Sequence, residues 1–170
     1  MSDSVFIPAS LWRRLAAMVY DSLLIFSVMI VVGITTLPFT NGLGISRDNI
    51  VIRLYIFSTL FVFLGWFWTH GGQTLGMRVW KIQLVQRDGT PVSWPLALFY
   101  FLVSLPMWGL LIFVIAVNAS IIPTPALLAH TPHWVLYLLA LIWFVVDHLP
   151  NNWRERIAKV RMISLSNKFV

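Results

Sequence analysis

The chain contains no cysteine among its 170 residues. Disulfides, thiolate nucleophiles and thiolate metal sites are therefore excluded. Charged residues are also scarce, at 11% of the chain, and only six residues are acidic. The sequence has no pair of catalytic carboxylates in a soluble cleft, no Ser/His/Asp order and no cofactor fingerprint, so we expect neither enzyme activity nor a bound cofactor.

Apolar residues make up most of the chain: 59% are hydrophobic, 15% are aromatic, and the mean hydropathy is +0.83. A soluble domain of this size cannot bury so much apolar surface. The length suits about four membrane spans of ~20 residues with short loops. We therefore expect a single all-α membrane domain over residues 1–170, with four transmembrane helices at about 15–37, 50–69, 95–118 and 132–149, a loop at 70–94 and a tail at 150–170.

The net charge of +6 would suit a nucleic-acid partner, but the distribution of the basic residues favours a membrane orientation. If the N-terminus is cytoplasmic, ten of the twelve Lys and Arg residues fall on the cytoplasmic side, and only Arg47 and Arg53 fall outside. This is the positive-inside bias of membrane proteins. We expect both termini in the cytoplasm, the lipid bilayer as partner and no nucleic acid, since aromatic and basic residues do not alternate as in nucleic-acid platforms.

The first predicted span contains one carboxylate, Asp21, and begins with Arg13 and Arg14. A charged side chain inside a span costs about 3 kcal/mol, so it usually faces protein or a watery cavity and has a partner. Arg14 lies two helical turns before Asp21, or ~10 Å along one face of the helix. One interpretation is that this pair is structural and fixes the packing of the helix bundle. The other makes Asp21 a group that trades a proton for a cation, because a carboxyl group shielded from water holds its proton more tightly.

Further ionisable residues, His70, Asp147 and His148, lie at the predicted cytoplasmic ends of spans two and four. Asp147 is a candidate site residue, although solvation at the interface would also explain its charge. His130 and His133 are spaced as ligands, but they lack a third ligand on the same side. We therefore expect no metal site.

The cytoplasmic loop opens with a glycine-rich turn that contains Gly72, Thr74 and Gly76. It lacks the GK[ST] ending of a phosphate-binding loop, so a tight interfacial turn is favoured. Residues 77–86 and 157–165 are basic runs with the alternation of β-strands. We predict that they pair as a small cytoplasmic β-element, which would bring Glu155 near Arg14 or Arg78. The alternative is that the tail lies on anionic lipid.

Two blocks resemble the RDD family of bacterial membrane proteins, which is named for one arginine and two aspartates. They are RRLAAMVYD at 13–21 and GQTLGMRVWKIQLVQRDGTPVS at 72–93. The family's arginine and first aspartate fall on Arg14 and Asp21. Its glycine-rich turn and basic strand fall on Gly72, Gln73, Thr74, Gly76 and Arg78.

The third block, in the tail, departs from the family pattern. Members carry a His-Asp pair and then a run that ends in Gly-Thr-Arg-Val. Here Glu155 stands where the second aspartate is expected, and Lys159 and Val160 replace the glycine and the threonine.

The resemblance implies an inner-membrane protein that transports ions or small solutes, with sodium/proton exchange proposed for some members. We expect a cation/proton exchanger with Asp21 as the cation-binding group, Arg14 as its modulator, and Glu155 and Asp147 as further site residues. Four helices are few for a transport path, which favours a homo-oligomer. The alternative is an accessory protein that docks a membrane partner protein through its basic cytoplasmic face.

Overall fold

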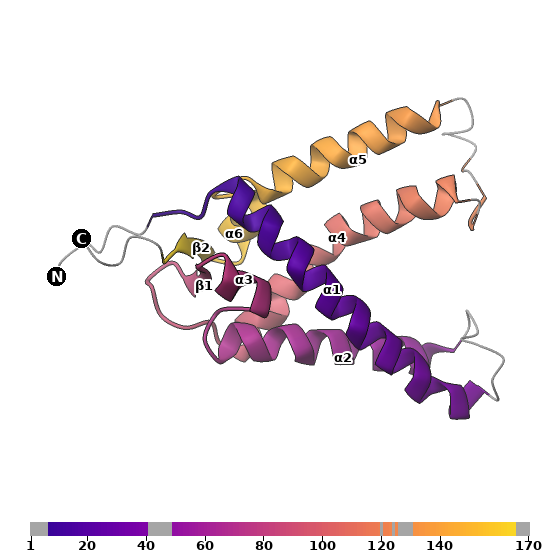
Figure 1. The fold of residues 1–170 in the computed structure, drawn as a ribbon, viewed down its shortest axis with the longest axis horizontal. Coiled ribbons are helices and arrows are strands. Elements are labelled where there is room, and N and C mark those ends of the chain that lie inside the picture. Colours follow the sequence, from indigo (N-terminus) through magenta and orange to yellow (C-terminus); the bar gives the residue numbers. More distant parts are fainter. Residues whose placement is uncertain (1–6, 41–48, 120, 124, 126–130, 166–170) are drawn as a thin grey trace.

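The computed structural model describes residues 7–40, 49–119, 121–123, 125 and 131–165, and its elements are mostly helical (Figure 1). The four longest helices are α1 (Leu11–Thr36), α2 (Ile50–Thr69), α4 (Trp94–Asn118) and α5 (His133–His148). Shorter elements are the 3-10 turn η1 (Leu37–Thr40), the helices α3 (Leu75–Val79) and α6 (Trp153–Ile157), and the strands β1 (Ile82–Gln86) and β2 (Val160–Ser164).

Three helices of the described chain are long and apolar enough to cross a membrane, at Leu11–Phe39, Ile50–Thr69 and Trp94–Asn118. The fourth apolar helix, α5, has 16 residues. At 1.5 Å per residue it is ~24 Å long, against a hydrocarbon core of ~30 Å. The prediction of a mostly helical membrane protein is confirmed.

The predicted β-element is also confirmed, because β1 and β2 pair antiparallel in a two-stranded sheet. Both predicted starts were too early, since Met77 lies in α3 and Ile157 is the last residue of α6. β2 starts only at Val160. For the first run, Thr74 decides where the strand begins. The reason is local: the Thr74 hydroxyl accepts a hydrogen bond from the Met77 backbone N–H at 3.2 Å, so Thr74 caps a short helix. The helical cap prevails over the valine and isoleucine content of the run, and the strand starts only at Ile82.

The described chain divides into two halves with the same order of elements: two long helices, a five-residue helix and a five-residue strand. Asn152 caps α6 as Thr74 caps α3, by accepting a bond from the backbone N–H three residues on. Seven residues after each cap stands a lysine, Lys81 or Lys159, with φ of 52°. A residue other than glycine is uncommon in this conformation, so its occurrence at the same position in both halves supports their equivalence.

The strand register follows the same symmetry. Ile82 pairs with Ser164 and Gln86 pairs with Val160, so the first residue of each strand faces the last residue of the other. A two-fold axis through the central pair, Leu84 and Met162, therefore exchanges the strands. The α1–α2 pair and the α4–α5 pair lie close together at the end of the molecule that carries the sheet. The two pairs move apart from each other toward the opposite end (Figure 1).

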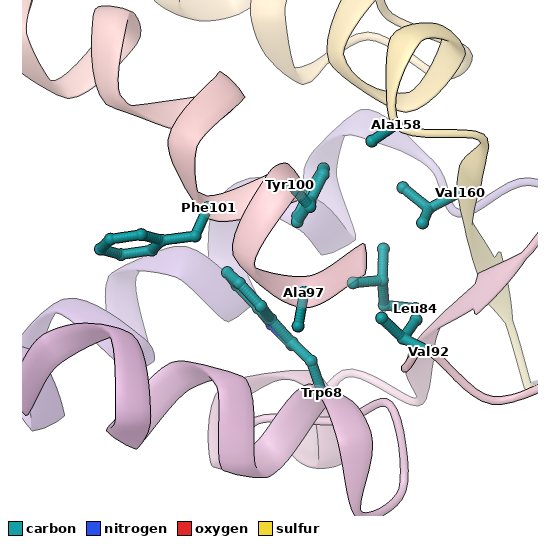
Figure 2. Close-up of a cluster of buried hydrophobic side chains, with 8 residues drawn as sticks. All are labelled: Trp68, Leu84, Val92, Ala97, Tyr100, Phe101, Ala158 and Val160. Atoms are coloured by element: carbon teal, nitrogen blue, oxygen red, sulfur yellow. The ribbon is translucent and has the colours of Figure 1, made fainter. Parts of the chain in front are cut away.

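A buried apolar cluster joins the halves beside the sheet (Figure 2). Trp68 of α2 packs edge-on against Tyr100 of α4, with ring centroids 5.3 Å apart. Leu84 of β1 and Val160 of β2 are buried next to them. The full set is Trp68, Leu84, Val92, Ala97, Tyr100, Phe101, Ala158 and Val160. This cluster fixes α4 and both strands relative to α2, and so holds the neighbouring polar groups in place.

Candidate functional site in a polar cavity between the two halves

A cavity of about 130 Å³ lies between α1 and α4 and is bounded by α3 and α6 at the sheet end. Apolar side chains such as Met18, Ile25 and Met107 form much of its wall. At ~30 Å³ per water molecule it has room for a few waters or a partly hydrated ion. Its polar lining consists of Arg14, Asp21, Thr74, Tyr100, Ser104, His148, Asn152 and Arg154.

Asp21 holds the start of α3. Its Oδ1 accepts a hydrogen bond from the Gly76 backbone N–H at 2.9 Å, and its Oδ2 accepts one from the Thr74 hydroxyl. A side chain at Gly76 would overlap the carbonyl oxygen of Ala17 on α1, so only glycine lets the two helices come this close. The glycine-rich turn of the sequence thus serves to dock α3 on Asp21.

Gly72, the other glycine of that turn, has φ of +68°, and a side chain there would overlap the carbonyl oxygen of Leu84. The Leu84 backbone N–H donates to the Gly72 carbonyl at 2.7 Å, which ties the turn to β1. Arg78, in contrast, is exposed on the last turn of α3 and does not line the cavity.

Arg14 pairs with Glu155 of α6, and this ion pair joins the two halves. Its other donors reach backbone carbonyls, with Nε 3.0 Å from Ala9 O and Nη2 3.2 Å from Met162 O. Both members are buried: Arg14 is 4% exposed and Glu155 is 2% exposed. Of the two arginines expected near Glu155, the structure therefore pairs it with Arg14. Asp21 instead binds Thr74 and Gly76 at the start of α3.

Asp147 forms a second buried ion pair, with Arg154 at 2.5 Å between Oδ2 and Nη2. Asp147 is only 1% exposed, so solvation at an interface does not explain its charge. Arg154 Nη1 also donates to the Ser104 hydroxyl at 3.0 Å, and its guanidinium lies 5.7 Å from the centre of the Tyr100 ring. Such a contact with a ring face adds a cation–π attraction.

The two halves use equivalent positions for these contacts. Asp21 and Ser104 each stand ten residues after the first residue of their long helix. They bind the second residue of the short helix in the same half, Gly76 or Arg154. The Asp21 carboxylate of the first half thus occupies the position that the Ser104 hydroxyl has in the second half. Both side chains line the cavity.

Sequence reasoning missed Ser104, Asn152 and Arg154 as site residues. Each had a local signal: Ser104 is a hydroxyl within an apolar helix, and Asn152 is a helix cap just before the charged segment Trp153–Ile157. His148 also lines the cavity, whereas its neighbour Asp147 does not. His70 instead stacks on Trp66, with ring centroids 3.8 Å apart, and does not line it.

The charges of the described residues at the cavity do not balance. Two buried ion pairs, Arg14–Glu155 and Arg154–Asp147, are each neutral. Asp21, a half-buried carboxylate that lines the cavity, adds one negative charge when ionised, so the five side chains have a net charge of −1 with His148 neutral. Every side-chain nitrogen of Arg14 is engaged, while each Asp21 oxygen accepts one bond and keeps a free lone pair. An uncompensated charge in such a site is costly, so the arrangement suits one proton or one cation at Asp21.

Among the described residues, no group of three or more His, Cys, Asp or Glu could hold a metal ion. His130 lies outside the described residues. A cation at Asp21 would therefore be held by one carboxylate with neutral oxygens and water, which suits a weakly bound, exchangeable ion.

Comparison with protein families gives a match to the RDD family over residues 8–125. Comparisons with curated proteins and with solved structures gave no match. The matched range contains Arg14, Asp21, Thr74 and Gly76, whereas Glu155 lies beyond it. Because the match covers more than half of the sequence and includes the residues that dock α3 on α1, the chain belongs to the RDD family.

Proposed function

We propose that this protein is a multi-pass transporter of the bacterial inner membrane that exchanges a cation for a proton at Asp21. The observation that carries the proposal is the surplus carboxylate at the cavity: Asp21 is half-buried and lines it, while the two arginines there, Arg14 and Arg154, are paired with Glu155 and Asp147. A proton or a small cation neutralises that charge, and the two compete for one carboxylate. Transporters built from internal repeats commonly place their ion sites at the interface of the repeats, which is where this cavity lies.

The proposed topology has four spans, α1, α2, α4 and α5, with both termini cytoplasmic. The two short helices and the sheet gather at one end of the molecule (Figure 1). Exposed basic residues of that end, including Arg78, Lys81, Arg87 and Arg156, support its cytoplasmic placement. The shorter α5 is accommodated by local thinning of the bilayer, which costs fractions of a kcal/mol per Å.

The Arg14–Glu155 pair would separate the cavity from the cytoplasm. Arg14 lines the cavity, whereas Glu155 lines a second pocket of about 380 Å³. The ion pair therefore lies between the two spaces. Parting of the two side chains would connect the two spaces. Arg14 would thereby control access to Asp21 as well as its electrostatic environment.

Exposed apolar faces of α1 and α5 support a homo-oligomer, in which helices of a second copy complete the path. Examples are Leu23 and Phe26 on α1 and Leu139 and Leu141 on α5. A lipid-facing surface has the same composition, so the size of the assembly in detergent decides between them.

A second candidate function is that of an accessory protein, and the bonds from Thr74 and Gly76 to Asp21 favour it. These bonds would give Asp21 a purely structural role, as a cap for α3. The basic cytoplasmic face would then bind a membrane partner protein.

Flux measurements in reconstituted liposomes distinguish the two functions. We expect an imposed pH gradient to drive a flux of monovalent cations through the wild type. Asp21→Asn should reduce this flux to the level of protein-free liposomes. Asparagine keeps the acceptor for the Gly76 N–H, so the variant should fold and keep its oligomeric size. Asp88→Asn, which removes an exposed carboxylate of the cytoplasmic loop, is the control and should leave the flux unchanged. A wild type without cation flux, together with an Asp21→Asn variant that fails to fold, would support the accessory role.

A further inference from the structure

The pocket on the far side of Glu155 is strongly basic. It is lined by three arginines, Arg87, Arg156 and Arg161, together with Asn151, Glu155 and Val160. Of the described residues that line it, Glu155 alone is acidic, and it is already paired with Arg14. The pocket therefore presents an excess of positive charge at a concave site on the sheet end of the molecule.

Backbone structure positions the arginines. The Arg87 backbone N–H donates to Lys159 O at 3.0 Å, which places Arg87 beside the start of β2. Arg161 is the second residue of β2 and pairs with Val85 of β1. Arg156 is on α6, and its Nε donates to Asn151 O at 3.0 Å, which fixes its guanidinium at the pocket.

Another carboxylate, Asp88, interacts electrostatically with Arg161, but its hydrogen bonds are to Thr90. Hydrogen bonds from the Thr90 hydroxyl and the Thr90 backbone N–H keep the pKa of Asp88 below its ordinary value, and Arg161 adds to this effect. Both bonds go to Asp88 Oδ1. Asp88 does not line the pocket, so it offsets the charge of the arginines only in part.

The internal symmetry shows that this charge is not required by the fold. In the first half, the positions equivalent to Arg161 and Glu155 are Gln83 and Met77, and only Arg156 has a basic counterpart, Arg78. The first half therefore has no equivalent basic pocket, although it contributes Arg87 to this one. Three guanidinium groups around one hollow form the arrangement that recognises phosphate, because each presents a planar fork of donors.

We propose that this pocket binds a phosphate group at the cytoplasmic face, next to the Arg14–Glu155 pair. The ligand is either the headgroup of an anionic phospholipid or a free phosphate compound, which share this chemistry. The proposal does not depend on transport. A bound phosphate would lie beside Glu155 and would repel its carboxylate by like charge.

Binding is measured on the full-length protein in a non-ionic detergent at constant ionic strength. One titration uses inorganic phosphate and the other uses a short-chain phosphatidic acid, with a short-chain diacylglycerol as the lipid that lacks phosphate. We expect the wild type to bind phosphatidic acid and not the diacylglycerol. The double variant R87Q/R156Q should bind at least about tenfold more weakly, since two charge-assisted contacts are removed.

The matched control is R78Q/K81Q, which removes two exposed basic residues of the first half and changes the net charge by the same amount. It should bind like the wild type. All four substituted side chains are exposed, so both variants should keep the wild-type melting temperature and elution volume without ligand. Binding of inorganic phosphate as well would assign the site to phosphate itself, and binding of phosphatidic acid alone would assign it to a lipid headgroup. The proposal is wrong if the wild type binds neither, or if the control loses as much affinity as R87Q/R156Q.

Discussion

Arg14→Met should lower the free energy of unfolding in detergent by about 3–5 kcal/mol, because it leaves the buried carboxylate of Glu155 without its counter-charge. Within the part of the chain that the structure describes, the other bond to that carboxylate is from the Asn151 backbone N–H, at 3.2 Å. The variant also removes one donor from each of the carbonyls of Ala9 and Met162, of which the Met162 carbonyl keeps its bond from the Ala9 backbone N–H. Glu155→Leu should cost a similar amount, since it leaves a buried guanidinium unpaired. Chemical or thermal unfolding followed by tryptophan fluorescence measures both changes.

The double variant Arg14→Met/Glu155→Leu should cost much less than the sum of the two single variants. With both charges gone, no charge remains unpaired, and apolar replacements of buried ion pairs are often nearly neutral. Arg156→Met is the surface control, since Arg156 is an exposed neighbour of Glu155, and it should change stability by no more than about 0.5 kcal/mol. Additive costs in the double variant would mean that the two residues do not act as a pair.

Gly76→Ala should separate α3 from α1 and cost about 3 kcal/mol, near the upper end for overpacking a tight contact. The new methyl group would overlap the carbonyl oxygen of Ala17 and would approach Asp21 Oδ1 to 2.9 Å. Backbone and not a flexible side chain stands in its way, so the short helix has to move. That movement would break the bonds from Gly76 and Thr74 to Asp21. Thermal unfolding in detergent measures the loss.

Gly33→Ala and Gly109→Ala serve as controls within the long helices. Apart from the backbone of its own helix, a methyl group at either position meets no atom of the described chain within 4 Å. Alanine has the higher helix propensity, so each change should be neutral or stabilising by up to about 1 kcal/mol. If Gly76→Ala proved as harmless as these controls, the close approach of α3 to Asp21 would not be a constraint on the fold.

The sequence was most informative where one local pattern carried the signal. The apolar runs predicted the helical membrane fold, and the alternating basic runs predicted the pairing of β1 with β2. A lone carboxylate in an apolar helix identified Asp21 as a residue that needs polar partners, and it has them in Thr74 and Gly76. In each case the signal lies within a few residues of the feature that it predicts.

Partner choice was harder to predict, because it depends on how distant elements pack. Spacing along one helix made Arg14 and Asp21 obvious partners, yet Arg14 pairs with Glu155, 141 positions away. The Arg154–Ser104 bond likewise joins residues 50 positions apart. The two-fold relation between the halves was also hidden, since their sequences share a helix cap and a lysine with positive φ rather than a run of identical residues.

Competition between a proton and a cation at Asp21 is tested most directly by proton release. Purified protein in a weakly buffered detergent solution is mixed with a monovalent cation salt, and the pH change is recorded against addition of a salt with a large organic cation. We expect release of up to about one proton per chain from the wild type and from Asp88→Asn, and none from Asp21→Asn. Equal release from wild type and Asp21→Asn, or no release from wild type at any pH between 5 and 9, a range of about two units on either side of neutrality, would contradict it.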